Sequence, residues 1–205
     1  WYVVDSEPGS YLYCGLSRDA SKEEILERIN NNTITDILNK IEVKAGDVVM
    51  VKAGTIHAIG AGVFICEIQQ NSNCTYRMYD YDRRDKFGNP RELHVKKALD
   101  VVDNHKYIKD NKTEVVIARN EHFTEERLVQ CKYFEVYKYD VNDEAKITVD
   151  EASFVSVLFI NGSGTIETDD YEKTMEFKAG DSFFVSAGLR SIIIKGQATM
   201  VVTRV

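Results

Sequence analysis

Three residues of types common in catalytic sites follow one another at ten-residue intervals: His57, Glu67 and Arg77. An imidazole can bind a metal, a carboxylate can carry a proton, and a guanidinium can stabilise a developing negative charge. The residues around Glu67 and Arg77 predict two neighbouring strands, in which Glu67 shares a face with Gln69, and Arg77 with Tyr79. A purely structural interpretation stays open. In that case His57 would be a histidine whose hydrogen bonds only stabilise the fold, and Glu67 and Arg77 would form a buried ion pair.

An internal repeat surrounds the first of these residues. Residues 42–57 read EVKAGDVVMVKAGTIH and residues 176–191 read EFKAGDSFFVSAGLRS, so that eight of the sixteen positions are identical. Each copy predicts two strands joined by a KAGD turn, in which Gly supplies an unusual backbone dihedral and Asp can accept a backbone hydrogen bond. The copies differ at the position of His57, where the second copy has Ser191. Only the first copy can therefore hold a metal at that place.

The first copy resembles the second half of the cupin motif, in which two glycines precede a metal-binding histidine. Gly46, Gly54 and His57 have the spacing of that motif, whereas Lys52 stands where Pro is usual and Ala61 where Asn often follows. In such a motif the glycines bound a strand and a turn, and the next strand points the imidazole into the barrel.

Three further segments resemble one family of cupin enzymes. The segment FICEIQQNSNCTYRMYDYDR (64–83) is similar to the strand pair after the metal histidine in the short bacterial, zinc-dependent (type I) mannose-6-phosphate isomerases. The segment RELHVKKALDVV (91–102) resembles the helix that follows there, and WYVV (1–4) resembles an early strand of the same enzymes. The resemblance covers nearly the whole chain and is most specific in its middle third.

This resemblance implies an activity and a role for each of the three residues. The family interconverts mannose 6-phosphate and fructose 6-phosphate through a cis-enediol, with zinc as the cofactor. By resemblance, His57 is a metal ligand, Arg77 is the catalytic arginine and Glu67 is an active-site glutamate. The partner implied is a small sugar phosphate; the oligomeric state and the physiological direction of the reaction stay open.

The other metal ligands of the family have no match in this sequence. The family takes a Gln and a His from a QxHP-type segment and a Glu from the segment before WYVV, so we expect these ligands to precede Trp1. Two other classes of protein stay open. A non-catalytic, sugar-binding cupin regulator would tolerate loss of Arg77, and a cupin dioxygenase would need an HxH pair, which the sequence lacks.

The elements that must position these residues are mainly strands. Runs of five to eight Val, Ile, Tyr and Phe residues, broken by Gly, Asn and Asp, predict an all-β fold of two cupin (jelly-roll) barrels. Ser21, with Glu24 three residues on, predicts a helix start, and two short helices form an insert over about 21–40. A further helix is expected over about 92–103. We therefore expect a first, incomplete catalytic barrel over 1–104 and a second, structural barrel over 113–205.

Composition restricts the classes of partner and compartment. The net charge of −7 disfavours a general nucleic-acid surface. The strongly apolar segment 155–160, which Ser156 interrupts, is far too short to span a membrane. The four cysteines show no CxxC spacing, which favours reduced, buried thiols in a cytoplasmic protein.

Overall fold

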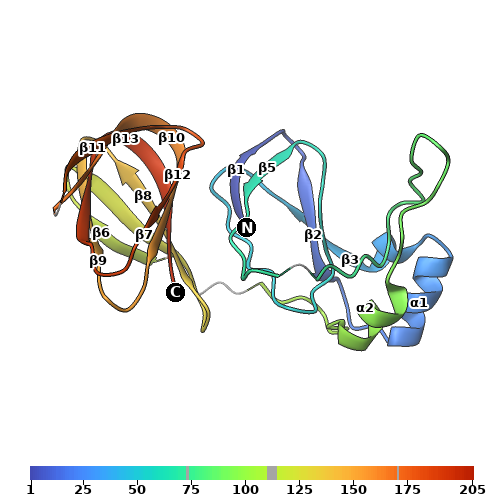
Figure 1. The fold of residues 1–205 in the computed structure, drawn as a ribbon. Coiled ribbons are helices and arrows are strands. Elements are labelled where there is room, and N and C mark those ends of the chain that lie inside the picture. Colours follow the sequence, from blue (N-terminus) through green and yellow to red (C-terminus); the bar gives the residue numbers. More distant parts are fainter. Residues whose placement is uncertain (73, 110–114, 170) are drawn as a thin grey trace. The chain divides into compact units, whose positions relative to one another are not determined.

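The chain folds into two compact units, Trp1–Lys109 and Asp110–Val205 (Figure 1). The structure is a computed structural model, and it describes residues 1–72, 74–109, 115–169 and 171–205. The expected start of the second barrel, residue 113, lies outside these described residues. Strands predominate over the chain as a whole, as the sequence predicts, although the first unit also contains α1, η1 and α2. The closure of each unit into a cupin barrel stays a prediction.

The first unit contains β1 (Tyr2–Ser6), β2 (Tyr11–Leu16), α1 (Lys22–Asn30), the 3₁₀ helix η1 (Ile34–Ile37), β3 (Leu38–Glu42), β4 (His57–Ile59), β5 (Val63–Cys66) and α2 (Val95–Val101). The second unit contains β6 (Val115–Arg119), β7 (Phe123–Gln130), β8 (Glu135–Val141), β9 (Glu144–Val149), β10 (Val155–Thr168), β11 (Tyr171–Lys178), β12 (Ser182–Val185) and β13 (Arg190–Arg204). In the first unit β1 pairs with β5, and β2 lies between β3 and β4.

The helical insert forms where the sequence predicts it. The Ser21 hydroxyl accepts a hydrogen bond from the Glu24 backbone N–H at 3.1 Å, which caps α1. Ile25 and Ile29 on the buried face of α1 pack with Leu16 and Val102 in one apolar cluster. The insert ends earlier than expected, because residues 38–42 are the strand β3, which pairs with β2.

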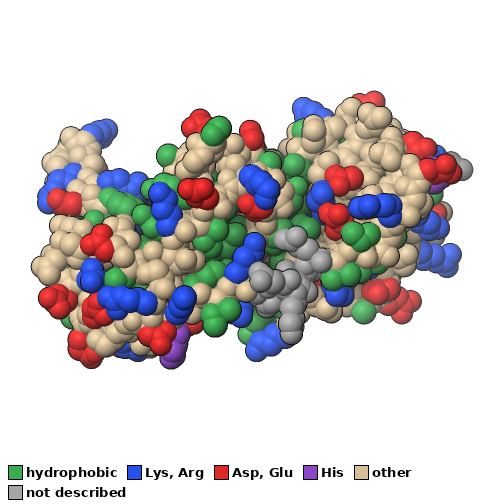
Figure 2. Space-filling view, turned by 180° about the vertical axis from the view of Figure 1, so that it is seen from behind, with side chains coloured by type: hydrophobic (Ala, Val, Ile, Leu, Met, Phe, Trp, Pro, Cys, Tyr) green, Lys and Arg blue, Asp and Glu red, His purple; other side chains and the backbone are tan. Residues whose placement is uncertain are grey.

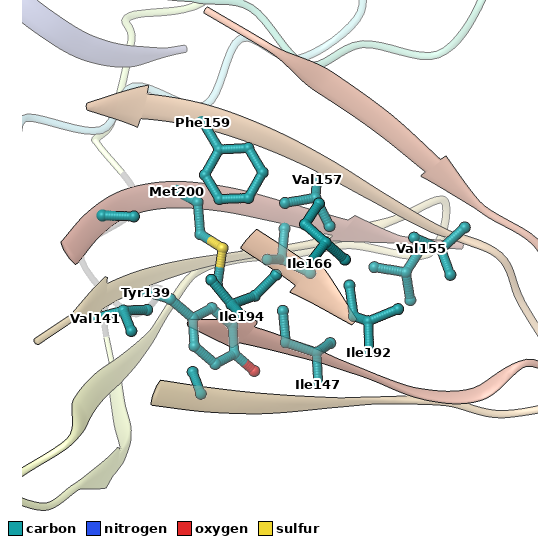
Figure 3. Packing of buried hydrophobic residues seen from close by; sticks show 14 of the residues in the cluster. Tyr139, Val141, Ile147, Val155, Val157, Phe159, Ile166, Ile192, Ile194 and Met200 are labelled. Carbon is teal, nitrogen blue, oxygen red and sulfur yellow. The ribbon is translucent and has the colours of Figure 1, made fainter. Parts of the chain in front are cut away.

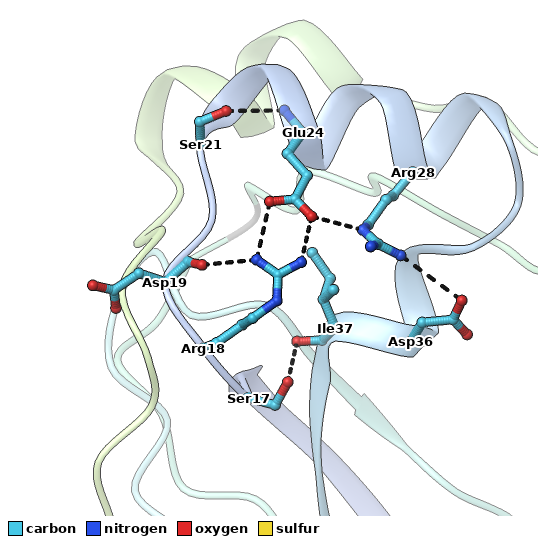
Figure 4. Close-up of polar contacts among 8 residues, drawn as sticks. All are labelled: Ser17, Arg18, Asp19, Ser21, Glu24, Arg28, Asp36 and Ile37. Carbon is cyan, nitrogen blue, oxygen red and sulfur yellow. Dashed lines mark hydrogen bonds and ion pairs between the residues drawn. The ribbon is translucent and has the colours of Figure 1, made fainter.

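The Glu24 side chain joins an ion-pair cluster instead of completing a capping box (Figure 4). Its carboxylate accepts hydrogen bonds from both Nη atoms of Arg18 and, at 3.0 Å, from Nε of Arg28. Arg28 also lies 3.8 Å from an Asp36 carboxylate oxygen on η1. These two guanidinium groups lower the pKa of Glu24 to about 2.

This pKa predicts how stability depends on pH. Because the pKa of Glu24 falls on folding, its stabilising effect is complete above the unfolded value and is lost as the pH falls toward 2. We expect Glu24→Gln to lower the thermal midpoint slightly at pH 7, with the deficit shrinking below about pH 4.5. The effect is small because the side chain is 31% exposed to solvent. Thermal denaturation between pH 2 and 7 measures it, with the exposed Glu27→Gln as control; a deficit that persisted at pH 2 would contradict the assignment.

The repeated KAGD turns adopt the same geometry in both units. Gly46 has φ of +92° and Gly180 of +89°, the left-handed region that favours glycine. In both turns the Asp carboxylate accepts a hydrogen bond from the backbone of the turn Lys at 2.9 Å. The sequence prediction that Gly and Asp form these turns is thereby confirmed.

The expected strands at Glu67 and Arg77 are not formed. β5 ends at Cys66, which pairs with Tyr2 at the start of β1, so Glu67 has no strand partner among the described residues. Around Arg77 the chain is irregular and turns sharply at residues 80–83, where Tyr81 and Asp82 have φ of +57° and +50°. No strand is assigned to residues 67–72 or 74–83, so the prediction of two neighbouring strands there is wrong.

The second unit is one eight-stranded sheet that curls around a single core (Figure 3). β8 and β9 pair with the two halves of β13 in one continuous register, from Glu135 opposite Arg204 to Val149 opposite Arg190. Buried residues from all six strands β8 to β13 contribute to one apolar cluster. Phe159 is fully buried in it and stacks on Phe177 with ring centroids 3.7 Å apart.

This core predicts a measurable cost for a small truncation. Ile194 is fully buried on β13, opposite Ala145. We expect Ile194→Val to lower the free energy of unfolding by about 0.5–1.5 kcal/mol, because it removes one methylene from a packed site. Denaturant unfolding measures the change, with Ile117→Val, at an isoleucine 49% exposed, as control. Equal losses in the two variants would contradict the burial.

Lysine, arginine and acidic side chains are interspersed over the face drawn in Figure 2, without a large patch of one sign. Among the described residues, no helix is long and apolar enough to cross a membrane. Cys14 and Cys66 are buried as free thiols, whereas Cys74 is exposed and Cys131 half-buried, so the expected burial of all four is wrong.

Candidate functional site

His57 is the first residue of β4 and lies opposite Cys14 of β2. Directly opposed residues of a sheet share a face, so the imidazole lies on the face of Cys14, which packs in the buried cluster with Val3 and Leu12. Its Nδ1 lies 2.7 Å from the Thr55 carbonyl oxygen, which can only accept a hydrogen bond. Nδ1 therefore carries the proton, and the Nε2 lone pair is left to accept a proton or bind a metal.

The turn before His57 requires glycine for two reasons. Gly54 has φ of +83°, and a Cβ atom there would lie 2.6 Å from the carbonyl oxygen of Val101 at the end of α2. The Gly54 carbonyl accepts a hydrogen bond from the Asp103 backbone at 2.9 Å. The second glycine of the cupin-like motif thus lets α2 dock directly on the turn that positions His57.

Trp1 connects His57 to Glu67. Its indole Nε1 donates a hydrogen bond of 2.9 Å to the Glu67 carboxylate. Its ring meets the His57 imidazole edge-on, with centroids 5.4 Å apart and planes at 75°. Two of the three sequence-predicted site residues therefore lie around one indole, and both are exposed to solvent, where a ligand can reach them.

Arg77 is held through its backbone by His94. The Arg77 N–H lies 3.3 Å from His94 Nδ1, and the His94 N–H donates to the Arg77 carbonyl at 2.7 Å. His94 directly precedes α2, so the helix fixes the position of the arginine segment. Among the residues that the structure describes, none forms a hydrogen bond or ion pair with the half-buried guanidinium.

The structure thus brings His57 and Glu67 together and leaves Arg77 without a described contact to either. Gln69 is exposed, and Tyr79 packs on the apolar cluster of α1 and η1. Sequence reasoning did not place two residues, Trp1 and His94, at the site. No sequence signal marks Trp1, because its contact with Glu67 joins residues far apart in the chain.

The equivalent place in the second unit holds a different polar group. Ser191 is 2% exposed and donates a hydrogen bond to the Asp169 carboxylate. Asp169 also accepts from Lys146 at 3.3 Å, and both contacts lower its pKa. The hydroxyl that replaces the imidazole of the first copy is therefore engaged in a structural contact.

The donor set for a metal is incomplete within the described residues. They contain no group of three His, Cys, Asp or Glu side chains placed to hold one ion. His57 fits the role of a single ligand, because its Nδ1–H is held by a carbonyl and its Nε2 has no hydrogen-bond partner among the described residues. A catalytic zinc site needs three protein ligands, so further donors are required.

Comparisons with known proteins agree on one family. Residues 124–205 match the family model "Mannose-6-phosphate isomerase, cupin domain". The whole chain is 39% identical to the Bacillus subtilis protein YvyI, and 99% of it is 32% identical to "Mannose-6-phosphate isomerase ManA" of the same organism. The chain spans 63% and 62% of the lengths of these two relatives.

Solved structures extend this similarity to the fold. The crystal structure of the mannose 6-phosphate isomerase from Bacillus subtilis superposes with a TM-score of 0.89 at 36% identity, covering 100% of this chain and 63% of that one. An Archaeoglobus fulgidus structure superposes with a TM-score of 0.64 at 18% identity, over 100% of this chain and 59% of that one, which shows the fold alone. By sequence and by fold, the chain is similar over its whole length to mannose-6-phosphate isomerases.

Proposed function

We propose that the whole protein interconverts mannose 6-phosphate and fructose 6-phosphate. The observation that carries this proposal is the match along the entire chain to a Bacillus subtilis mannose-6-phosphate isomerase, in sequence and in structure. The exposed His57–Trp1–Glu67 arrangement lies in the unit where the family resemblance expects the site.

The proposed chemistry moves a proton between C2 and C1 of the open-chain sugar through an enediol. Glu67 is the candidate that accepts and returns this proton, and the Trp1 indole orients its carboxylate through one oxygen. Arg77 stabilises the negative charge that develops on the substrate oxygens, a role open to a guanidinium that has no acidic partner among the described residues. Each role requires the group to reach the substrate directly.

Zinc is the proposed cofactor, with His57 Nε2 as one ligand. When bound, zinc supplies Lewis-acid polarisation of the substrate oxygens. The remaining ligands are proposed to come from sequence outside residues 1–205, since the relatives are longer and the described residues lack a three-donor group. His57 contributes by holding its own Nδ1–H on Thr55, which fixes the direction of Nε2.

The same proposal covers architecture and compartment. We propose two cupin barrels, of which the first, over about 1–104, is catalytic and the second, over about 113–205, lacks a metal site because Ser191 replaces the histidine. The four free cysteines support a reducing compartment, the cytoplasm.

The experiment that tests the function is conversion of mannose 6-phosphate by the whole protein, before and after treatment with a chelator. We expect fructose 6-phosphate to form, the activity to be lost on chelation, and zinc to restore it. The other candidate, a non-catalytic sugar-binding regulator, would bind the sugar phosphate without converting it. Absence of conversion with zinc present would overturn the isomerase assignment.

A further inference from the structure

The carboxylate of Asp80 is buried in the turn that follows Arg77. Among the residues that the structure describes, Asp80 is the only buried one with a charged side chain, and it is 6% exposed. A charged group taken out of water costs free energy unless hydrogen bonds or opposite charges compensate it. The partners of this carboxylate therefore show what fixes the turn.

Two exposed arginines approach this carboxylate from different parts of the segment. Arg83 donates from Nη2 to Oδ1 of Asp80 and, at 3.3 Å, from Nε to the Asp80 carbonyl oxygen. The Nε atom of Arg91 lies 3.8 Å from Oδ2 of Asp80. Oδ2 is buried and accepts no hydrogen bond from a described residue, since 3.8 Å exceeds the usual N–H···O distance of about 2.7–3.2 Å. The contact with Arg83 is thus a hydrogen-bonded ion pair, whereas the contact with Arg91 is electrostatic.

The contact between Asp80 and Arg91 continues the pairing that holds Arg77. The backbone N–H groups of Arg77 and His94 both donate across the segment. Asp80 follows Arg77 by three residues in the sequence. Arg91 precedes His94 by three residues, so the ion pair lies in the same antiparallel register as these backbone contacts. Beyond the ion pair the chain forms the green projection of the first unit in Figure 1, so Asp80 joins the two sides of the segment between this projection and Arg77.

We propose that Asp80 is a positioning residue that holds Arg77 in place for catalysis. Its carboxylate ties the turn after Arg77, through Arg83, to the returning chain, through Arg91. The turn needs such a tie because two of its residues adopt left-handed backbone, which costs free energy in residues other than glycine. The inference rests on the proposed isomerase function, to which it adds a residue that acts through Arg77.

Kinetics of single variants of the whole protein give the first test. Asp80→Asn keeps the size of the side chain but turns an N–H group toward one of the two arginines, so one contact is lost. We expect kcat to fall about tenfold with KM within about twofold, because a small displacement of a catalytic group lowers the rate strongly. Arg91→Gln, at an exposed position, should lower kcat in the same direction and serves if Asp80→Asn fails to fold. Arg84→Gln is the matched control and should keep the normal rate, because Arg84 pairs with the exposed Asp82.

A double-mutant cycle distinguishes positioning from a general structural role. A residue that acts through Arg77 loses its effect on the rate once the Arg77 guanidinium is removed. In an Arg77→Ala background we therefore expect Asp80→Asn to lower the remaining rate by less than about twofold, since the two changes affect one and the same interaction. If Asp80→Asn lowered the rate by the same factor with and without the guanidinium, the effects would be independent and the positioning role would be overturned.

An NMR measurement separates failure of this inference from failure of the proposed function. If the whole protein with zinc does not convert mannose 6-phosphate, the isomerase assignment fails, but the position of Arg77 can still be followed. The backbone N–H signal of Arg77 reports its contact with His94. We expect Asp80→Asn and Arg91→Gln to shift this signal and to leave the signal of the exposed Arg119 unchanged. An Arg77 signal that stayed in place in both variants would overturn the positioning role, whether or not the protein is active.

Discussion

Replacing Arg77 by Ala in the whole protein is expected to lower kcat by roughly 10²–10³-fold, the usual cost of removing one positioned donor that stabilises a transition-state charge. The cost in stability should be small. Among the described residues no acidic group pairs with the Arg77 guanidinium, so the substitution leaves no buried charge uncompensated. His94 holds this segment through backbone atoms, which the substitution retains.

Steady-state kinetics and thermal denaturation of the same preparation measure both halves of this expectation. Arg119→Ala, at an exposed position of β6, is the matched control and should keep full activity. Arg77→Lys should recover only part of the rate, because an ammonium keeps the charge and loses the planar fork. An Arg77→Ala enzyme with normal kcat would remove this residue from the mechanism.

The second large effect is expected for His57. Replacing it by Ala removes the imidazole whose Nε2 is left free by the bond from Nδ1 to Thr55. Changes in the outer shell of metal sites already cost 10–100-fold in affinity or activity, so loss of a direct ligand should exceed about 100-fold in both. The fold should persist, because the side chain is exposed.

Zinc content after dialysis and the rate of mannose 6-phosphate conversion measure this loss. His105→Ala is the matched control, since His105 is exposed and its side chain contacts only Asp103 among the described residues. A His57→Ala protein that kept one zinc per chain would place the metal elsewhere.

Local chemistry made part of the fold predictable from the sequence. Gly46 and Gly180 need left-handed backbone, and the Asp that follows each accepts a backbone hydrogen bond, so the repeated turns were predictable residue by residue. The capping of α1 by Ser21 was predictable too, because the Ser21 hydroxyl accepts a hydrogen bond from a backbone N–H only three residues further along the chain.

The surroundings of the site were less predictable because they depend on distant contacts. β5 ends at Cys66, which pairs with Tyr2 of β1, and the alternation of residues 64–70 cannot reveal this pairing. The turn at residues 80–83 places Tyr81 in the left-handed backbone region, which aromatic residues rarely adopt. Aromatic residues are instead common in strands, so the residue propensities of this segment predicted a strand. The Trp1–Glu67 hydrogen bond joins residues that no local pattern connects.

The claim that catalysis is built on His57 in the first unit is tested most directly by locating the metal. Crystals of the whole protein with zinc, measured at the zinc absorption edge, should show one anomalous peak about 2.0–2.1 Å from His57 Nε2. Glu67 and Arg77 should face the same open coordination side. An anomalous peak inside the second unit, or a zinc ion bound with His57 Nε2 left uncoordinated, would contradict this account of the site.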